Sequence, residues 1–135
     1  MVVEPKASAR NGAGLLIAQH LPVAHAGLTL DPFQIRTGER YAQADFTYVM
    51  PWLFHHWPAE LPVAEKRDAF RDDWTIADLL AADELLRKCS GVDASRVGIV
   101  GHCWDGRVAW LNACHLPHLK AAAVFYGGRA KGVGA

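Results

Sequence analysis

The amino-acid sequence predicts an α/β fold, a three-layer sandwich in which helices cover both faces of a mostly parallel sheet. Short apolar runs that are typical of buried strands alternate along the chain with longer segments of helical periodicity. Glycine and proline stand at many of the boundaries between these segments. Such alternation favours right-handed crossover connections, which place consecutive strands parallel to one another.

The expected order is strand, helix, strand, helix, strand, helix, strand, within one domain of residues 1–135 whose core spans about residues 13–128. The predicted strands are residues 14–19, 46–50, 97–100 and 121–126. The predicted helices are residues 31–44, 68–88 and 103–114.

Turn-forming residues limit the elements of the first half. The apolar run Gly14–Gln19 stops before Pro22 and suits a strand that is buried on both faces. Asp31 offers an N-cap for the first helix, which Gly38 weakens. The β-branched and aromatic run that follows is closed by Pro51 and predicts the second strand.

A long aromatic loop, residues 52–62, follows the second strand. It contains the neighbouring residues His55 and His56 between Trp52 and Trp57. Rings this dense either line a substrate pocket or pack the loop onto the core, and packing is the favoured interpretation.

The longest predicted helix, residues 68–88, is indicated by apolar side chains at helical spacing. Its expected buried face consists of Phe70, Trp74, Ala77, Ala81 and Leu85. Its expected solvated residues include Arg71, Asp72, Asp78, Asp83, Glu84 and Arg87. Gly91 ends this helix, and the apolar run that follows predicts the third strand.

The charge pattern excludes nucleic acid and anionic membranes as partners. The chain has 14 basic and 14 acidic residues, and no run of Lys or Arg forms the positive stripe that these partners require. No apolar stretch approaches the roughly 20 residues of a membrane-spanning helix. Residues 1–11 lack the apolar core of a secretory signal. We therefore expect a cytoplasmic protein that binds a small molecule or another protein.

The cysteines predict neither a disulfide framework nor a zinc site. Cys89, Cys103 and Cys114 are odd in number, and their spacing matches no metal-binding pattern. Three of the histidines also form no ligand set: His25, His115 and His118. We expect free thiols in a reducing compartment, no metal and no cofactor.

One motif places a reactive side chain in a sharp turn. Residues 101–106, Gly-His-Cys-Trp-Asp-Gly, lie between the third predicted strand and the third predicted helix. A residue in such an elbow projects its side chain above the sheet, and glycines flank it because a Cβ atom there would collide with backbone. Cys103 also precedes a helix N-terminus, where the dipole favours the thiolate. These features predict a nucleophile rather than a buried apolar residue.

This motif resembles the Gly-x-Cys-x-Gly-Gly elbow of the dienelactone hydrolases, also called carboxymethylenebutenolidases. Three further segments resemble that family in order and spacing, namely residues 15–19, 48–51 and 121–128. The resemblance covers most of residues 13–128. It implies an α/β-hydrolase fold, and a hydrolase that opens lactones or cleaves small esters through an acyl-enzyme.

The resemblance also implies roles for individual residues. Cys103 would be the nucleophile, and the backbone N–H groups of Trp104 and Leu21 would hold the oxyanion. In the family an aspartate and a histidine follow the nucleophile, each after a further strand. Because this sequence stops seven residues after Gly128, we expect a partial α/β-hydrolase fold without the segment that carries them.

Three residues around the elbow need separate interpretation. Asp105 stands at the first trailing glycine of the motif, and its charge is expected to raise the pKa of the thiol, against the helix dipole. His20 follows the first strand, where family members commonly carry a glutamate. It is the local candidate for the catalytic base, the alternative being a loop residue without a catalytic role. His102 is expected to pack, because adjacent side chains at an elbow point apart.

Two functions remain open. The first is a cysteine hydrolase of small esters or lactones. The second is a catalytically incompetent hydrolase fold that serves as a structural or self-associating module. In the second case the apolar edge of the last strand, residues 121–126, is expected to favour homo-oligomers.

Overall fold

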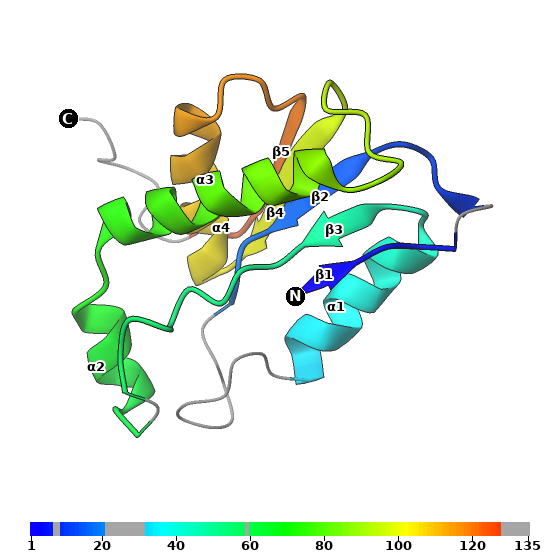
Figure 1. Cartoon of the computed structure of the whole chain (residues 1–135). Helices are drawn as coiled ribbons and strands as arrows, with labels where there is room; N and C mark the ends of the chain where they lie inside the picture. The colour runs from blue at the N-terminus through cyan, green and yellow to red at the C-terminus, as the bar shows by residue number, and fades with distance from the viewer. Residues whose placement is uncertain (7–8, 21–31, 59, 128–135) are drawn as a thin grey trace.

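Nine strands and helices make up the described part of the chain, which the computed structural model gives as residues 1–6, 9–20, 32–58 and 60–127 (Figure 1). The strands are β1 (Val2–Val3), β2 (Gly14–Ile17), β3 (Thr47–Val49), β4 (Val97–His102) and β5 (Ala121–Phe125). The helices are α1 (Pro32–Gln43), α2 (Val63–Asp68), α3 (Asp72–Lys88) and α4 (Trp104–His115). No helix in these ranges has the length and apolar character needed to cross a membrane.

The strands form one sheet in the order β1-β3-β2-β4-β5. β2 pairs in parallel with both β3 and β4, and β4 pairs in parallel with β5. The predicted α/β class with a mostly parallel sheet is therefore confirmed. β1 was not predicted, because two residues carry no periodic pattern; it adds an antiparallel edge strand, with Val2 opposite Val49. The predicted N-cap, Asp31, lies outside the described residues.

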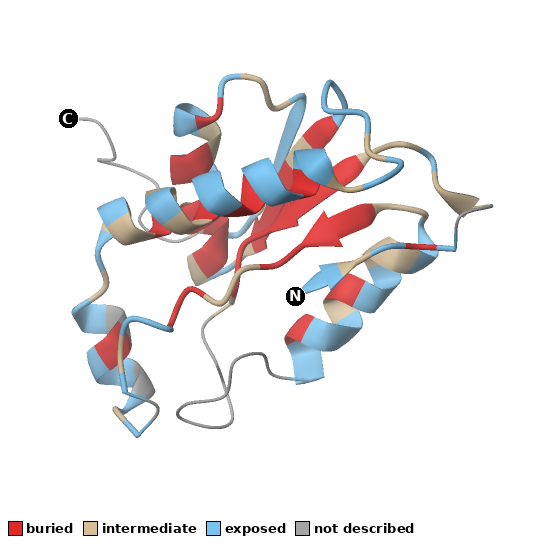
Figure 2. Ribbon diagram, viewed as in Figure 1, coloured by how far each residue is buried: buried red, intermediate tan, exposed pale blue. Residues whose placement is uncertain are grey.

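Helices lie on both faces of the sheet, with α1 on the side opposite α3 and α4 (Figure 1). The core on the α3 and α4 side includes Leu16, Val49 and Ile99, and the core on the α1 side includes Leu15 and Ile17. Every residue of β2 is buried, as expected for a strand with a core on each face. Figure 2 shows the buried residues gathered on the strands and on the inner faces of the helices.

Gly38, which weakens α1 by propensity, is required by packing. A Cβ atom at this position would lie 2.3 Å from the hydroxyl oxygen of Tyr48 on β3. Tyr48 itself is almost fully buried. The glycine therefore lets the helix backbone approach the sheet over a large aromatic side chain.

The predicted buried face of α3 was wrong. The buried residues are Thr75, Leu79, Ala82, Asp83 and Leu86, whereas the exposed fraction of Leu85 is 48%. α3 also begins at Asp72, after the separate helix α2. The aromatic residues that suggested the other face contact the loop after β3: the ring centroids of Phe70 and Phe54 are 5.2 Å apart, and those of Trp74 and Trp57 are 5.1 Å apart.

Asp83 on α3 was also wrongly assigned to solvent. Its exposed fraction is 1%, and an arginine and a histidine from different parts of the chain contact its carboxylate. Arg87 Nε donates to Asp83 Oδ2 at 2.8 Å, and His118 Nε2 lies 3.0 Å from Asp83 Oδ1. A buried carboxylate is retained when its charge and its lone pairs have partners. Glu84, by contrast, is solvated as expected and lies 3.9 Å from Lys88.

β5 is the edge strand next to β4 in the described sheet. Four of its five residues are exposed, among them Ala121, Ala123 and Phe125. An open hollow of about 330 Å³ lies beside it, and its lining includes Lys120, Gly98 and Ala121. This hollow is at the N-terminal ends of the strands and therefore lies away from the predicted elbow, which follows the C-terminal end of β4.

The corrected face of α3 can be tested with two neighbouring leucines. Leu79 is fully buried, whereas the exposed fraction of Leu80 is 41%. We expect Leu79→Ala to lower the free energy of unfolding by about 2–5 kcal/mol, because it leaves a cavity in the core. Leu80→Ala should change it by less than about 0.5 kcal/mol. Urea unfolding of both variants measures the difference, and equal losses would contradict this assignment of the buried face.

Candidate active site

The turn between β4 and α4 holds its central residue in a strained conformation. β4 ends at His102, α4 begins at Trp104, and Cys103 lies between them with φ 60° and ψ −121°. A positive φ is uncommon for a residue with a side chain and is typical of functional turns. Cys103 is exposed, and its thiol is free. The predicted elbow is therefore present in the structure.

Close contacts between backbone segments explain the glycines of the elbow. A Cβ atom on Gly101 would lie 2.1 Å from the carbonyl oxygen of Asp105, and one on Gly106 would lie 2.9 Å from that of Phe125. The predicted need for small residues at these two positions is confirmed. The backbone N–H of Cys103 donates to the carbonyl oxygen of Phe125 at 2.9 Å, which fixes the turn to β5.

Two histidines lie near the elbow and are linked through Phe33. The ring centroids of His20 and Phe33 are 5.5 Å apart, and those of Phe33 and His102 are 6.4 Å apart. Burial lowers the pKa of His102, and the neighbouring His20 lowers it further. His20 is thus brought to the same sheet edge as Cys103. The ring of His102 stacks on Phe125 at 4.8 Å, which confirms its predicted packing role.

Asp105 lies inside the elbow rather than beside the thiol in solvent. Its exposed fraction is 1%, and its Oδ2 accepts a hydrogen bond from the backbone N–H of His102 at 2.8 Å. Its Oδ1 is buried without a partner among the described residues. Burial raises the pKa of Asp105 to about 7, although the hydrogen bond from His102 opposes this shift. Near neutral pH the carboxyl group therefore carries only part of the charge that the sequence suggested.

An arginine on α4, the helix that follows the elbow, forms an ion pair with α3. Arg107 donates two hydrogen bonds to the carboxylate of Asp72, each 2.7 Å long. The hydrogen bond and the charge of Asp72 raise the pKa of Arg107. Such a bidentate pair also fixes orientation. Sequence reasoning placed Asp72 among the solvated charges and did not find this pair, because the two residues lie on different helices.

The loop after β3 packs against Trp104 and α3 through the aromatic cluster, defined as Phe54, Trp57, Phe70, Trp74 and Trp104. The ring centroid of Trp104, the residue after Cys103, lies 5.6 Å from that of Phe54 and 4.6 Å from that of Phe70. The favoured packing interpretation is therefore correct for Phe54 and Trp57. The histidines of the same loop turn toward Asp78 on α3, a partner that sequence reasoning missed.

Some predicted site residues are not placed. Leu21 lies outside the described residues, as does His25. Trp104 stands at the N-terminus of α4, where the first backbone N–H groups of a helix have no partner within the helix itself.

A mostly parallel sheet with a strained cysteine at a strand-to-helix elbow defines the chain as an α/β hydrolase by fold. A profile of the dienelactone hydrolase family matches residues 3–133. The chain belongs to the dienelactone hydrolase family.

Relatives support this membership over part of their length. The chain is 38% identical over 65 residues to an inferred carboxymethylenebutenolidase of Methylorubrum extorquens. This match covers 48% of the chain and 22% of that protein. It is 55% identical over 58 residues to an inferred carboxymethylenebutenolidase of Salmonella typhimurium. That match covers 42% of the chain and 20% of that protein. These matched segments thus span about a fifth of each curated relative.

Solved structures share the fold. The crystal structure of an inferred dienelactone hydrolase from Klebsiella pneumoniae matches with a TM-score of 0.73 and 28% identity, over 92% of the chain and 52% of that structure. A dienelactone hydrolase-like promiscuous phosphotriesterase from metagenomic libraries matches with a TM-score of 0.68 and 19% identity, over 93% of the chain and 49% of that structure. The chain therefore spans about half the length of these proteins.

Titration of Asp105 should make folding depend on pH. Because its pKa in the folded protein, about 7, exceeds the ordinary value of 3.8, the folded state binds the proton more tightly. The stabilisation is complete below about pH 4 and is lost as the pH rises toward 7, with a magnitude on the order of 4 kcal/mol. Urea unfolding at several pH values should show this loss in the wild type and not in Asp105→Asn. Parallel pH profiles for the two proteins would contradict it.

Proposed function

We propose that this chain is a hydrolase of small esters or lactones that uses Cys103 as its nucleophile. The observation that carries this proposal is the strained elbow, in which an exposed cysteine with a positive φ precedes the N-terminus of α4. Strain at one residue persists only where the surrounding structure enforces it, and it is common at catalytic nucleophiles. Family membership supports the same reaction class.

In the proposed reaction the Sγ atom of Cys103, as a thiolate, attacks the carbonyl carbon of the substrate. The tetrahedral intermediate collapses, the C–O bond breaks, and the alkoxide oxygen takes up the proton that the base removed from the thiol. The alcohol leaves from an ester, whereas in an opened lactone the hydroxyl group stays attached to the acyl chain. A thioester acyl-enzyme remains. Water then adds to the thioester carbonyl, the C–S bond breaks, and the acid and the thiol are released.

Two backbone N–H groups are proposed to hold the oxyanion, those of Trp104 and Leu21. The position of Trp104 at the helix N-terminus supports its role, since free N–H groups and the helix dipole favour negative charge there. Packing of the Trp104 ring against Phe54 and Phe70 fixes this residue beside the nucleophile. The assignment of Leu21 rests on the family resemblance alone.

His20 is the proposed general base within this chain. Its location beside Phe33 and His102 supports the assignment, because it brings an imidazole to the edge of the sheet where the elbow lies. His102 is the poorer candidate, since its ring is held in a stack against Phe125.

Hydrolysis of a p-nitrophenyl short-chain ester tests the nucleophile. Cys114 gives a matched control, because it is an exposed free thiol near the other end of α4. We expect Cys103→Ala to lower the rate of ester hydrolysis at least about 100-fold, because the variant lacks the nucleophile. Cys114→Ala should keep it. Intact mass should show an acyl adduct that disappears only in Cys103→Ala.

The outcomes separate the assignments. An equal rate in Cys103→Ala and wild type, or an adduct that needs Cys114, would remove the proposed nucleophile. His20→Ala in the same assay should retain adduct formation at a rate reduced roughly 10-fold or more. An unchanged rate in His20→Ala would remove the base and leave the nucleophile in place.

A second candidate function, self-association, is favoured by the exposure of β5. Edge strands present unpaired N–H and C=O groups on which another chain can add a strand, and Ala121, Ala122 and Ala123 are all exposed. We expect a dimer in sedimentation equilibrium that is weakened at least roughly 10-fold by Ala123→Lys, since edge charges oppose pairing. Ala64→Lys, at an exposed position of α2, is the control. A monomer at high concentration would exclude this role.

A further inference from the structure

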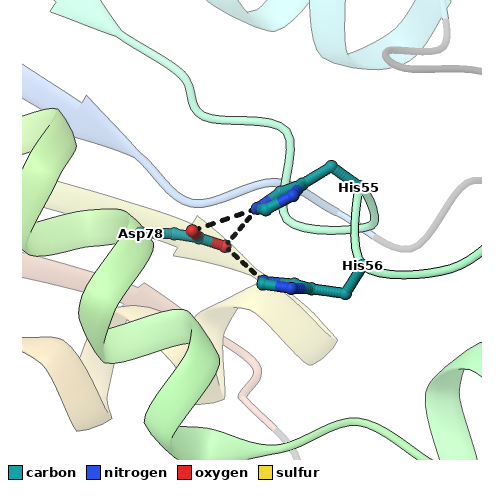
Figure 3. Close-up of side chains that lie close together, drawn as sticks. All are labelled: His55, His56 and Asp78. Atoms are coloured by element: carbon teal, nitrogen blue, oxygen red, sulfur yellow. Dashed lines mark hydrogen bonds and ion pairs between the residues drawn. The ribbon is translucent and has the colours of Figure 1, made fainter.

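Three side chains from two elements meet at one point outside the elbow. His55 and His56 lie in the loop after β3, and Asp78 lies on α3 (Figure 3). His55 Nε2 lies 3.1 Å from each carboxylate oxygen of Asp78, and His56 Nε2 lies 3.2 Å from Oδ2. Figure 3 shows both rings directing the same edge toward the carboxylate.

Packing holds the two rings in this arrangement. The centroids of His55 and His56 are 3.8 Å apart, and the rings lie at 36° to each other. His56 also stacks on Trp74 with a centroid distance of 4.4 Å. The preceding residues Leu53 and Phe54 are buried in the core, which anchors the loop. The donor atoms are therefore fixed by their surroundings before any ligand is present.

We propose that His55, His56 and Asp78 form a binding site for a divalent transition-metal ion such as Zn²⁺. One donor atom from each residue lies within 4.8 Å of the others. Zinc bonds of about 2.0–2.2 Å in tetrahedral geometry place neighbouring ligand atoms about 3.3–3.5 Å apart. The observed nitrogen-to-oxygen separations of 3.1 and 3.2 Å are close to this value.

The donor chemistry selects the class of ion. Imidazole nitrogen favours Zn²⁺, Co²⁺, Ni²⁺ and Cu²⁺, whereas Mg²⁺ and Ca²⁺ favour sites made only of oxygen. Two histidines and one carboxylate also match a three-ligand zinc site whose fourth position takes water. A bound ion would join the loop after β3 to α3. The site is independent of the hydrolase activity proposed above.

A hydrogen-bonded cluster without metal is the competing explanation, and it requires different protonation. To donate to Asp78, each imidazole carries its proton on Nε2. To bind a metal through Nε2, each carries its proton on Nδ1 instead. The two arrangements are distinguishable because the ¹⁵N chemical shifts of the imidazole report which nitrogen is protonated.

The test uses the full chain without a polyhistidine tag, stripped of metal with a chelator and titrated with Zn²⁺ in a calorimeter. We expect one ion per chain. His55→Ala and Asp78→Asn should each weaken binding at least roughly tenfold, because each removes one ligand. His55→Ala is the safer variant, since the side chain of His55 is 43% exposed.

Two controls match the chemistry of the site. His118→Ala removes the histidine of a different His–Asp pair, the one between His118 and Asp83. This variant should leave the Zn²⁺ affinity unchanged. Cys103→Ser should do the same. Titration with Co²⁺ should give ligand-field bands without a thiolate charge-transfer band, which excludes binding through cysteine.

The results decide between the explanations. Saturable binding that is lost in His55→Ala and Asp78→Asn, together with a shift of the proton to Nδ1 in the ¹⁵N spectrum, would establish the site. The proposal is overturned by an absence of saturable binding, by equal weakening in His118→Ala, or by a thiolate band with Co²⁺. Circular dichroism of each variant shows that it remains folded.

Discussion

The direct contact of backbone on backbone at the elbow is the constraint on which the rest of the site depends. At Gly101 and Gly106 the chain passes so close to Asp105 and Phe125 that a single methyl group would collide with a carbonyl oxygen. This contact brings the end of β4, the start of α4 and the end of β5 together. It also leaves Cys103 in its left-handed conformation, because the segments on either side of it are fixed.

The sequence predicted the architecture well because the strands of a parallel sheet are buried on both faces and carry continuous apolar runs. Features set by contacts between elements were harder to predict. The buried face of α3 was assigned from Phe70 and Trp74, which are apolar but pack against the loop after β3. Asp83 was placed in solvent because its partner His118 comes from a distant segment. Helical periodicity does not indicate which of two apolar stripes meets the sheet.

In the candidate site, too, some residues could be predicted from local sequence and others could not. Cys103 could be found from the sequence, since the glycines of an elbow must lie at fixed spacing from the nucleophile. The partnership of His55 and His56 with Asp78 could not, because it depends on how a long loop docks on a helix more than twenty residues away. The only sequence signal was the pair of adjacent histidines. The partial neutrality of Asp105 likewise follows from burial, which no local pattern reveals.

The aromatic cluster gives this molecule a mechanical connection between two regions that are distant in sequence. Trp104 contacts Phe54 and Phe70, Phe70 contacts Trp57, and Trp57 contacts the ring of His56. Close-packed rings are nearly incompressible, so a displacement of one must be absorbed by its neighbours. A change in how the loop after β3 packs is therefore expected to reach Trp104, the residue after the nucleophile, through these ring contacts.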